Sequence, residues 1–287
     1  MKGIILAGGI GSRLYPLTKY VSKQLLPIYD KPMIYYPLST LMMGKIKDIL
    51  IISDSHNIKF FKKLFGNGRQ FGINLSYCVQ EKPNGIAEAF ILGSEFIGND
   101  NVALILGDNI FYGENLSNLV KSSIKMTERG KSVIIGHKVP DPERYGVAVI
   151  KNKKVFEIQE KPKLPKSDIA IVGLYFYTNE VISKAKSLKP SSRGELEITD
   201  LNNLFILENK MEVNLMGEGF TWLDTGTFDS LHEASSFVKL LQGSSNYRLG
   251  LIDEIAYLNN FISKQQLEKN LLNLSIDFQK YLTKKYL

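Results

Sequence analysis

The chain has 287 residues, 44% of them hydrophobic, with one cysteine, Cys78, and a formal net charge of +7, which is long enough to bury one large core. No apolar stretch could span a bilayer, and no leader pattern precedes the first strand pattern, so we expect a cytoplasmic protein with no membrane partner. As the single cysteine, Cys78 can form neither an internal disulfide nor a thiolate metal cluster. Basic residues are scattered rather than interleaved with aromatic ones, which argues against nucleic acid as a partner.

The first half of the chain alternates strand-like runs with helical patterns. Short apolar runs predict strands at Lys2–Ala7, Asp48–Ser53, Asn74–Val79 and Val102–Leu106. The segments between them have helical periodicity, at Met33–Met43, Ile58–Phe65 and Ile86–Phe96. This alternation predicts a parallel sheet with helices on both faces, and the near-continuous apolar run of the last strand fits burial on both sides.

The second half contains more strands and fewer helices between them. Strands are expected at Ser132–Lys138, Gly146–Ile150, Val155–Glu160 and Ile171–Tyr177, followed by helices at Glu180–Ser187 and Glu195–Glu208, a strand pair at Glu212–Met216 and Phe220–Leu223, and a helix at Phe228–Leu241. Strands that follow one another so closely suggest antiparallel additions to the sheet.

The fold class that follows is α/β, a Rossmann-like sheet that is mixed but mainly parallel and flanked by helices. Residues 1–241 form the main domain, with two halves, and residues 242–287 form a small C-terminal helical segment. The apolar positions of that tail are expected to pack on the main domain or on a neighbouring subunit: Leu267, Leu271, Leu274, Phe278 and Leu282.

A glycine-rich turn follows the first strand, with Gly8, Gly9 and Gly11 before the helical start. Such a turn lets backbone N–H groups approach phosphate oxygens, although a tight turn without a ligand has the same composition. A dinucleotide-binding loop needs another glycine where Leu14 stands, and a Walker loop needs a Gly-Lys-Ser/Thr run that is absent. The turn instead carries Arg13, whose fork of donors suits a triphosphate.

Several strings in order resemble the sugar-1-phosphate nucleotidylyltransferase family. They begin with Gly8-Gly9-x-Gly11-Ser12-Arg13-Leu14-x-Pro16-Leu17-Thr18 and Ser22-Lys23-Gln24-Leu25-Leu26-Pro27, and continue with Tyr29–Ser39, Asp141–Val147, Gly173–Tyr177, Arg193–Asp200 and Trp222–Thr227. Together they look like the glucose-1-phosphate thymidylyltransferase branch. The resemblance covers Lys2 to about Leu241 and continues more weakly through the tail.

This resemblance implies the nucleotidyltransferase fold and a reaction in which a sugar phosphate attacks the α-phosphorus of a nucleotide. It implies dTTP and glucose 1-phosphate as substrates, Mg²⁺ as cofactor, a homotetramer, and a place in dTDP-sugar biosynthesis such as that of dTDP-rhamnose for polysaccharides. Uridylyl transfer from UTP is the alternative within enzymes. A non-catalytic sugar-nucleotide sensor is the alternative outside them.

The resemblance also implies residue roles. The catalytic set is Arg13, Lys23, Asp108, Lys161 and Asp224, of which Asp108 and Asp224 form the metal pair. Nucleotide binding is implied for Leu6, Gly8, Gly9, Gly11, Ser12, Arg13, Lys23, Gln24, Gln80, Pro83, Gly85 and Asp108. Sugar-phosphate binding is implied for Asn109, Tyr145, Gly146, Glu160, Lys161, Val172, Tyr175 and Arg193. Without the resemblance, Asp108 and Asp224 would each be interpreted as a turn or helix-capping residue.

Five positions depart from the family pattern. Ser12 keeps the hydroxyl of the usual threonine, and Glu81-Lys82 adds charges beside the base-reading residue Gln80. Glu218 and Leu251 stand where relatives often carry arginine and cysteine near a second nucleotide site. Because an acidic residue repels a diphosphate, we expect weakened or altered feedback by nucleotide sugar.

Overall fold

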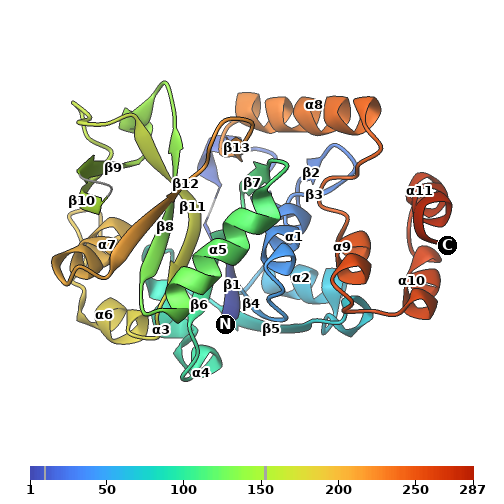
Figure 1. Ribbon diagram of the computed structural model, residues 1–287, viewed down its shortest axis with the longest axis horizontal. Helices are drawn as coiled ribbons and strands as arrows, with labels where there is room; N and C mark the ends of the chain where they lie inside the picture. The colour runs from blue at the N-terminus through green and yellow to red at the C-terminus, as the bar shows by residue number, and fades with distance from the viewer. Residues whose placement is uncertain (10, 152–153) are drawn as a thin grey trace.

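The computed structural model describes residues 1–9, 11–151 and 154–287. Its core is a nine-stranded mixed sheet in which seven strands follow the order β10-β9-β11-β6-β1-β4-β5, while β8 pairs with β11 and β12 (Figure 1). The strands of the N-terminal half are β1 (Lys2–Leu6), β4 (Asp48–Ser53), β5 (Asn74–Val79) and β6 (Val102–Leu106). Those of the other half are β8 (Ser132–Lys138), β9 (Gly146–Lys151), β10 (Lys154–Glu160), β11 (Ile169–Tyr177) and β12 (Met211–Leu215).

The N-terminal half of the sheet is parallel, as the sequence predicts. β1 lies between β4 and β6, with Gly3 opposite Ile49 on one side and Ala103 on the other. Successive side chains of these strands enter opposite faces of the sheet, because a strand alternates its side chains. Ile4 and Ile5, both fully buried, therefore belong to two different apolar clusters. The sheet is consequently buried on both faces.

Helices cover both of these faces. The cluster that contains Ile5 is closed by α1 (Tyr35–Met43), α2 (Ile58–Phe65), α5 (Leu116–Glu128) and α9 (Ile252–Leu258). The cluster that contains Ile4 is closed by α3 (Glu88–Leu92), α4 (Ser94–Ile97), α6 (Val181–Ser187) and α7 (Ile198–Leu207). The expected three-layer α/β architecture is confirmed.

The second half of the sheet is largely antiparallel, as expected, with β11 antiparallel to β6, β8 and β9. A register shift in β11 between Ile171 and Tyr175 divides this half into two arms, β9–β10 and β8–β12. The expected pairing of the strands at 212–216 and 220–223 is wrong. β12 runs parallel to β8, because α6 and α7 carry the chain back before it begins, and β13 (Thr221–Asp224) pairs with β7 (Asn109–Tyr112).

Some elements differ from the sequence prediction. The helix expected at 86–96 is split at Gly93, where an added Cβ would lie 2.9 Å from the Ala89 carbonyl oxygen and 3.1 Å from Ile4. The long helix α5 escaped prediction because its buried face includes polar Ser123 and Thr127, which weaken the apolar periodicity. The short strands β2 (Pro27–Ile28), β3 (Lys31–Pro32) and β7 were also not predicted.

The C-terminal segment is helical and packs on the main domain. It follows α8 (Phe228–Ser244) and consists of α9, α10 (Lys264–Leu271) and α11 (Ile276–Tyr286). Leu267 and Leu282 are fully buried in the cluster that contains Ile5. Beside them, Glu254 of α9 accepts hydrogen bonds from the tail residues Tyr281 and Lys285 at 2.8 and 2.9 Å. The tail therefore satisfies a buried carboxylate as well as covering apolar surface.

Asn270→Ala should destabilise the fold by about 2 kcal/mol at neutral pH, since its Nδ2 donates at 2.8 Å to the buried carboxylate of Asp253. Burial raises the pKa of Asp253, and the Asn270 hydrogen bond opposes that rise. Removing the bond raises the folded pKa further, so the extra destabilisation is absent below the unfolded pKa and grows as pH rises. Thermal unfolding at pH 4 and pH 7.5 measures this difference. A loss equal at both pH values would contradict it, and Asn273→Ala is the matched control.

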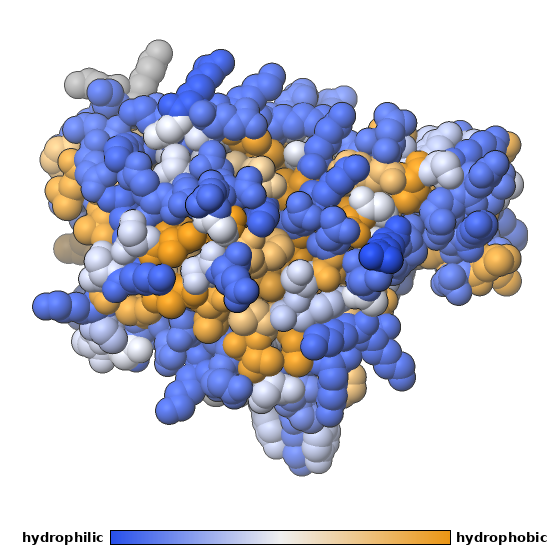
Figure 2. All heavy atoms as spheres, turned by 90° about the horizontal axis from the view of Figure 1, so that it is seen from below, coloured by the Kyte–Doolittle hydropathy of each residue, from blue (hydrophilic) through white to orange (hydrophobic). Residues whose placement is uncertain are grey.

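The face seen from below in Figure 1 mixes hydrophilic side chains with smaller hydrophobic areas (Figure 2). The hydrophobic side chains gather across the middle of this face, with hydrophilic side chains around them (Figure 2). Among the described helices, none combines the length and the apolar character needed to cross a membrane.

Candidate active site

The glycine turn and Asp108 lie at the same edge of the sheet. β1 and β6 are parallel neighbours, and the N–H of Gly107 donates to the Leu6 carbonyl at 2.9 Å. Asp108 and Gly8 therefore both lie just beyond the carboxyl ends of adjacent strands, which is where ligands bind in such sheets.

A separate two-stranded ladder brings Asp224 to Asp108. β13 pairs with β7 so that Asp224 lies opposite Asn109, the residue after Asp108. Thr225 fixes this register, because its hydroxyl donates to the Asp108 carbonyl at 2.8 Å and its N–H donates to the same oxygen at 3.2 Å. Burial and the neighbouring negative charge of Asp108 raise the pKa of Asp224. The predicted carboxylate pair is thus brought together, at an electrostatic cost in the free protein.

Lys23 lies against one member of this pair. It starts the single 3₁₀ turn Lys23–Leu25, and its Nζ forms an ion pair with Asp108 Oδ2. Burial alone would raise the pKa of Asp108, but the Lys23 charge, the Lys23 hydrogen bond and a hydrogen bond from Asn109 together lower it. Asp108 is therefore held as a carboxylate.

Asn109 connects the carboxylate pair to the centre of the sheet. Its Nδ2 donates to Asp108 Oδ1 at 3.0 Å, and its Oδ1 accepts from the Gly173 N–H at 3.0 Å and from Trp222 Nε1 at 2.6 Å. An alanine Cβ at Gly173 would lie 2.6 Å from Asn109 Oδ1, so this position needs glycine. In this structure Asn109, which is 2% exposed, uses its amide to orient Asp108.

A cavity of about 350 Å³, here called the carboxylate cavity, opens beside the aspartates. Nine of the expected site residues line it, namely Arg13, Asp108, Asn109, Tyr145, Gly146, Glu160, Lys161, Tyr175 and Asp224. Sequence reasoning assigned no role to Arg144, Thr199, Asn202 and Trp222, which also line it. All of these except Asn202 fall within the strings quoted above for the family resemblance, which is the signal that could have identified them.

Two charged residues of this cavity, Glu160 and Lys161, lie at the end of β10 and directly after it. The Thr199 hydroxyl donates to Glu160 Oε2 at 2.6 Å, and Lys161 Nζ lies 3.8 Å from Glu160 Oε1. Lys161 has φ +41° although a proline follows it. A non-glycine residue in this region is strained, and such strain concentrates at functional sites. Lys161 lines the carboxylate cavity from this strained position.

Arg193 and Val172 do not line the carboxylate cavity, although the resemblance implies a contact with the sugar phosphate for Arg193 and backbone contacts with the sugar for Val172. Arg193 donates to Glu197 at 2.7 Å and lies 3.5 Å from Glu160 Oε1, so it contacts the cavity wall indirectly. The Val172 side chain is fully buried in the cluster on the opposite face of the sheet. Only its backbone could face the cavity, as do its neighbours Ile171 and Gly173.

A second cavity of about 320 Å³, here called the glycine-turn cavity, lies against the turn after β1. Four expected nucleotide-binding residues line it, Gly8, Gly9, Gln80 and Pro83. Thr18, Val21, Ser22, Asp54, Asn57 and Glu81 complete it. Asp54 and Asn57 were not predicted as site residues, although Asp54 follows a strand of the parallel sheet, which is the kind of position where ligands bind.

The remaining expected nucleotide-binding positions support these walls. Gln24 is 1% exposed, and its Nε2 donates to the Gly8 carbonyl at 3.4 Å. The Gly11 carbonyl accepts from the Thr18 hydroxyl at 2.8 Å, and Ser12 is the first residue of the 3₁₀ turn that carries Arg13. Leu6 ends β1 directly before the turn.

Gly85 lies where the loop after β5 contacts the segment before α7. It has φ +106°, and an added Cβ would lie 2.4 Å from the Leu196 carbonyl oxygen. The Leu196 N–H donates to Asn84 at 2.7 Å, and Ala87 donates to Leu196 at 3.2 Å. The same segment carries Arg193, which contacts Glu160. One stretch of chain therefore contacts both Gly85, which does not itself line the glycine-turn cavity, and Glu160 of the carboxylate cavity.

The donors at the aspartate pair suit a hard divalent cation. Within residues 1–9, 11–151 and 154–287, no group of three or more His, Cys, Asp or Glu side chains could hold a metal. Two carboxylates nevertheless match Mg²⁺, which is usually bound through one or two carboxylates with phosphate oxygens and water. One of the two carboxylates, that of Asp108, also forms an ion pair with Lys23.

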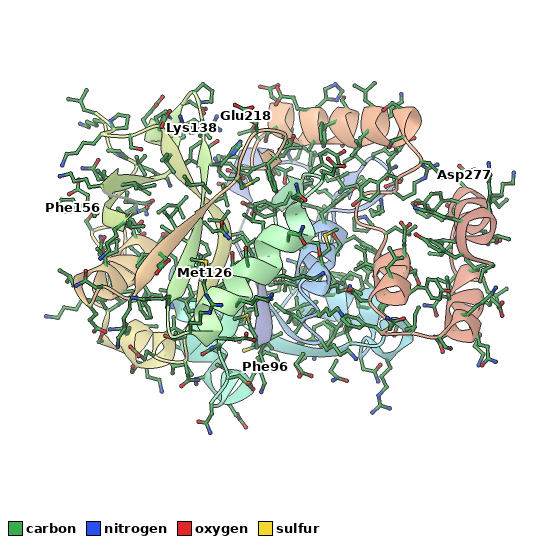
Figure 3. The ribbon with its side chains drawn as sticks, viewed as in Figure 1. Phe96, Met126, Lys138, Phe156, Glu218 and Asp277 are labelled. Atoms are coloured by element: carbon green, nitrogen blue, oxygen red, sulfur yellow. The ribbon has the colours of Figure 1, made fainter. Side chains whose placement is uncertain are left out.

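Glu218 and Leu251 lie apart from both cavities. Glu218 is exposed in the connection between β12 and β13 (Figure 3), whereas Leu251 is 3% exposed before α9. The expectation of weakened feedback stays a prediction.

Residues 2–240 match the family model described as nucleotidyl transferase. A glucose-1-phosphate thymidylyltransferase of Neisseria meningitidis is 53% identical over 94% of this chain and 93% of its own length. One of Xanthomonas campestris pv. campestris is 49% identical over 98% and 96%. Both matches extend over nearly the whole of each chain.

Comparison with solved structures agrees with these sequence matches. A Bacillus anthracis crystal structure, described as a candidate glucose-1-phosphate thymidylyltransferase in complex with a sucrose, has a TM-score of 0.76 at 44% identity, over 83% of this chain and 94% of that one. A UDP-glucose pyrophosphorylase complexed with UDP-glucose has a TM-score of 0.72 at 23% identity, over 84% of this chain and 98% of that one, which shows the common fold alone. With a glycine turn beside an aspartate pair, and with relatives that align over nearly its full length, this chain belongs to the nucleotidyl transferase family and, within it, to the glucose-1-phosphate thymidylyltransferases.

Proposed function

We propose that this protein transfers a thymidylyl group from dTTP to α-D-glucose 1-phosphate, giving dTDP-glucose and pyrophosphate. The observation that carries the proposal is the position of Asp108 and Asp224 on one wall of the carboxylate cavity, with Arg13 and Lys161 also lining it. Two phosphate-bearing substrates must meet for this reaction, and such a site supplies the cations and the metal-binding carboxylates that the meeting requires.

Asp108 and Asp224 would hold Mg²⁺, and the aspartate carboxylates fit this ion for the reason given above. When bound, Mg²⁺ supplies charge neutralisation at the phosphoryl group under attack. Lys23, held against Asp108, contributes a fixed positive charge at the same edge of the sheet.

The other residues bind and orient the two substrates. Arg13 would donate to the triphosphate from the end of the glycine turn, and Lys161 would hold the phosphate of glucose 1-phosphate. Glu160 would accept hydrogen bonds from sugar hydroxyls. An oxygen of the sugar phosphate then forms a bond to the α-phosphorus of dTTP as the bond from that phosphorus to the pyrophosphate oxygen breaks. The protein's contribution is mainly alignment and electrostatics.

Lys161→Ala should raise KM for glucose 1-phosphate about a hundredfold and change KM for dTTP little, because the ammonium group lines the carboxylate cavity and not the glycine-turn cavity. Steady-state kinetics with each substrate varied in turn measures both values. Lys163→Ala, an exposed lysine in the same loop, is the matched control. Equal losses for both substrates would contradict the assignment to the sugar phosphate.

A matrix of nucleotides against sugar phosphates, with pyrophosphate release as the readout, tests the proposed function. We expect the highest kcat/KM for dTTP with glucose 1-phosphate in the presence of Mg²⁺. Higher kcat/KM with UTP would favour the uridylyltransferase alternative, since an amide such as Gln80 reads the edge common to thymine and uracil. Release at background with every pair would favour a sensor.

We also propose, from the resemblance of the sequence, that the protein acts as a homotetramer in the cytoplasm. Its product would feed the dTDP-sugars used for polysaccharides, such as dTDP-rhamnose.

A further inference from the structure

Gln80 is the amide at the wall of the glycine-turn cavity. It follows β5 directly and is 5% exposed. Its Oε1 lies beside the glycine turn, 2.6 Å from the place a Cβ on Gly8 would occupy. Glycine at position 8 therefore leaves room for this oxygen, and both residues line the glycine-turn cavity.

Glu88 fixes which atom of the Gln80 amide points there. Gln80 Nε2 lies 2.7 Å from Glu88 Oε2, and Asn84 Nδ2 lies 2.8 Å from Glu88 Oε1. A carboxylate only accepts hydrogen bonds, so it must be faced by the NH₂ end of each amide. The two ends of an amide are otherwise interchangeable in shape. With Nε2 bound to Glu88, the acceptor Oε1 is the end left for the cavity.

An acceptor at this position distinguishes pyrimidines of the same size. Thymine and uracil carry an N3–H donor between two carbonyl groups, whereas cytosine carries an unprotonated N3 acceptor. Gln80 Oε1 can accept from N3–H but would face the lone pair of cytosine N3. Two buried acceptors that face each other lose a hydrogen bond on both sides, which is a large penalty in a site closed to water.

We propose that Glu88 is a positioning residue for base selection, which locks the Gln80 amide so that the site takes N3–H pyrimidines and rejects cytosine. This inference rests on the proposed function, in which the glycine-turn cavity receives the base. Glu88 acts through Gln80 and does not touch the substrate. Its two hydrogen bonds make the orientation a property of the free protein, formed before the nucleotide binds.

Glu88→Gln tests the proposal, because a glutamine can accept from Asn84 and donate to Gln80 Oε1 at the same time. Because the variant side chain can bond the Gln80 amide in either orientation, the lock on one orientation is lost, and with the amide reversed Nε2 would point into the cavity and donate to cytosine N3. We expect the ratio of kcat/KM for dUTP over dCTP, both with glucose 1-phosphate, to fall at least about tenfold. The pair dUTP and dCTP is used because the two bases share the absence of the thymine methyl group.

Two matched variants separate positioning from loop stability. Glu95→Gln makes the same change at an exposed carboxylate on α4, away from the glycine-turn cavity, and Asn84→Ala removes the other partner of Glu88 but leaves the Glu88–Gln80 bond. Both should keep the wild-type ratio. An unchanged ratio in Glu88→Gln, or equal losses for dUTP and dCTP, would overturn the proposal.

Equilibrium binding of dUTP and dCTP, measured without a sugar phosphate, separates this inference from the proposed function. A wild-type preference for dUTP that Glu88→Gln loses would support the role of Glu88 even if no transfer occurred. Equal binding of both nucleotides by the wild type would overturn that role even if transfer were fast.

Discussion

Asp224→Asn should lower kcat at least about a thousandfold and, in the free protein, raise Tm. The loss of activity follows because an amide is a poor ligand for Mg²⁺ and the change removes half of the carboxylate pair. The gain in stability follows from the raised pKa of Asp224, caused by burial and by Asp108. A raised folded pKa contributes stability below the unfolded pKa that is lost as pH rises, so at neutral pH the charged side chain destabilises the fold.

Steady-state kinetics and thermal unfolding at pH 7.5 without Mg²⁺ measure the two effects in the same preparation. Asp277→Asn makes the same change at an exposed residue on α11 (Figure 3) and should leave kcat unchanged. A fall in Tm for Asp224→Asn would contradict the electrostatic account of the pair, and near-normal kcat would contradict the metal assignment.

Lys23→Met should also abolish most activity, but it should destabilise the fold by about 3 kcal/mol. The side chains of Lys23 and Asp108 are 14% and 13% exposed, so the substitution leaves a buried carboxylate without its partner and next to Asp224. We expect kcat to fall at least about a hundredfold, because the positive charge beside the phosphoryl group is lost. Denaturant unfolding and steady-state kinetics measure the two losses.

Lys19→Met, an exposed lysine in the same loop region, is the control for Lys23→Met. The opposite signs of the stability changes at Lys23 and Asp224 are a signature of this site, since a general disturbance of packing would destabilise both variants. Equal destabilisation of the two would show that their shared electrostatic origin is wrong.

The parallel half of the fold could be predicted from sequence because each strand there is a short apolar run that is buried on both faces. The predicted bounds of β4, β5 and β6 agree with the structure, and so do those of α2. The partners of β12 and β13 could not be predicted, because pairing between strands depends on how α6, α7 and the turn after β12 direct the chain. Local periodicity carries no such information.

The candidate site shows the same division. The local sequence is enough to place Asp108 at the end of an apolar strand and Arg13 in a glycine-rich turn. The meeting of Asp108 with Asp224 depends on the β7–β13 ladder, which the residues alone do not reveal, and that expectation came from the family resemblance. The orientation of Gln80 by Glu88 depends on side-chain contacts across a loop. It becomes visible only in three dimensions.

The segment before α7 has a consequence for how the two substrates influence one another. Leu196 packs against Gly85 in the loop after β5, while Arg193, three residues earlier, contacts Glu160 at the carboxylate cavity. A shift of this segment would therefore move the groups beside Gly85 and beside Glu160 together. Were one substrate to bind more tightly because the other holds this segment, thermodynamic linkage would require the effect to be reciprocal, so that each substrate would lower the dissociation constant of the other by the same factor.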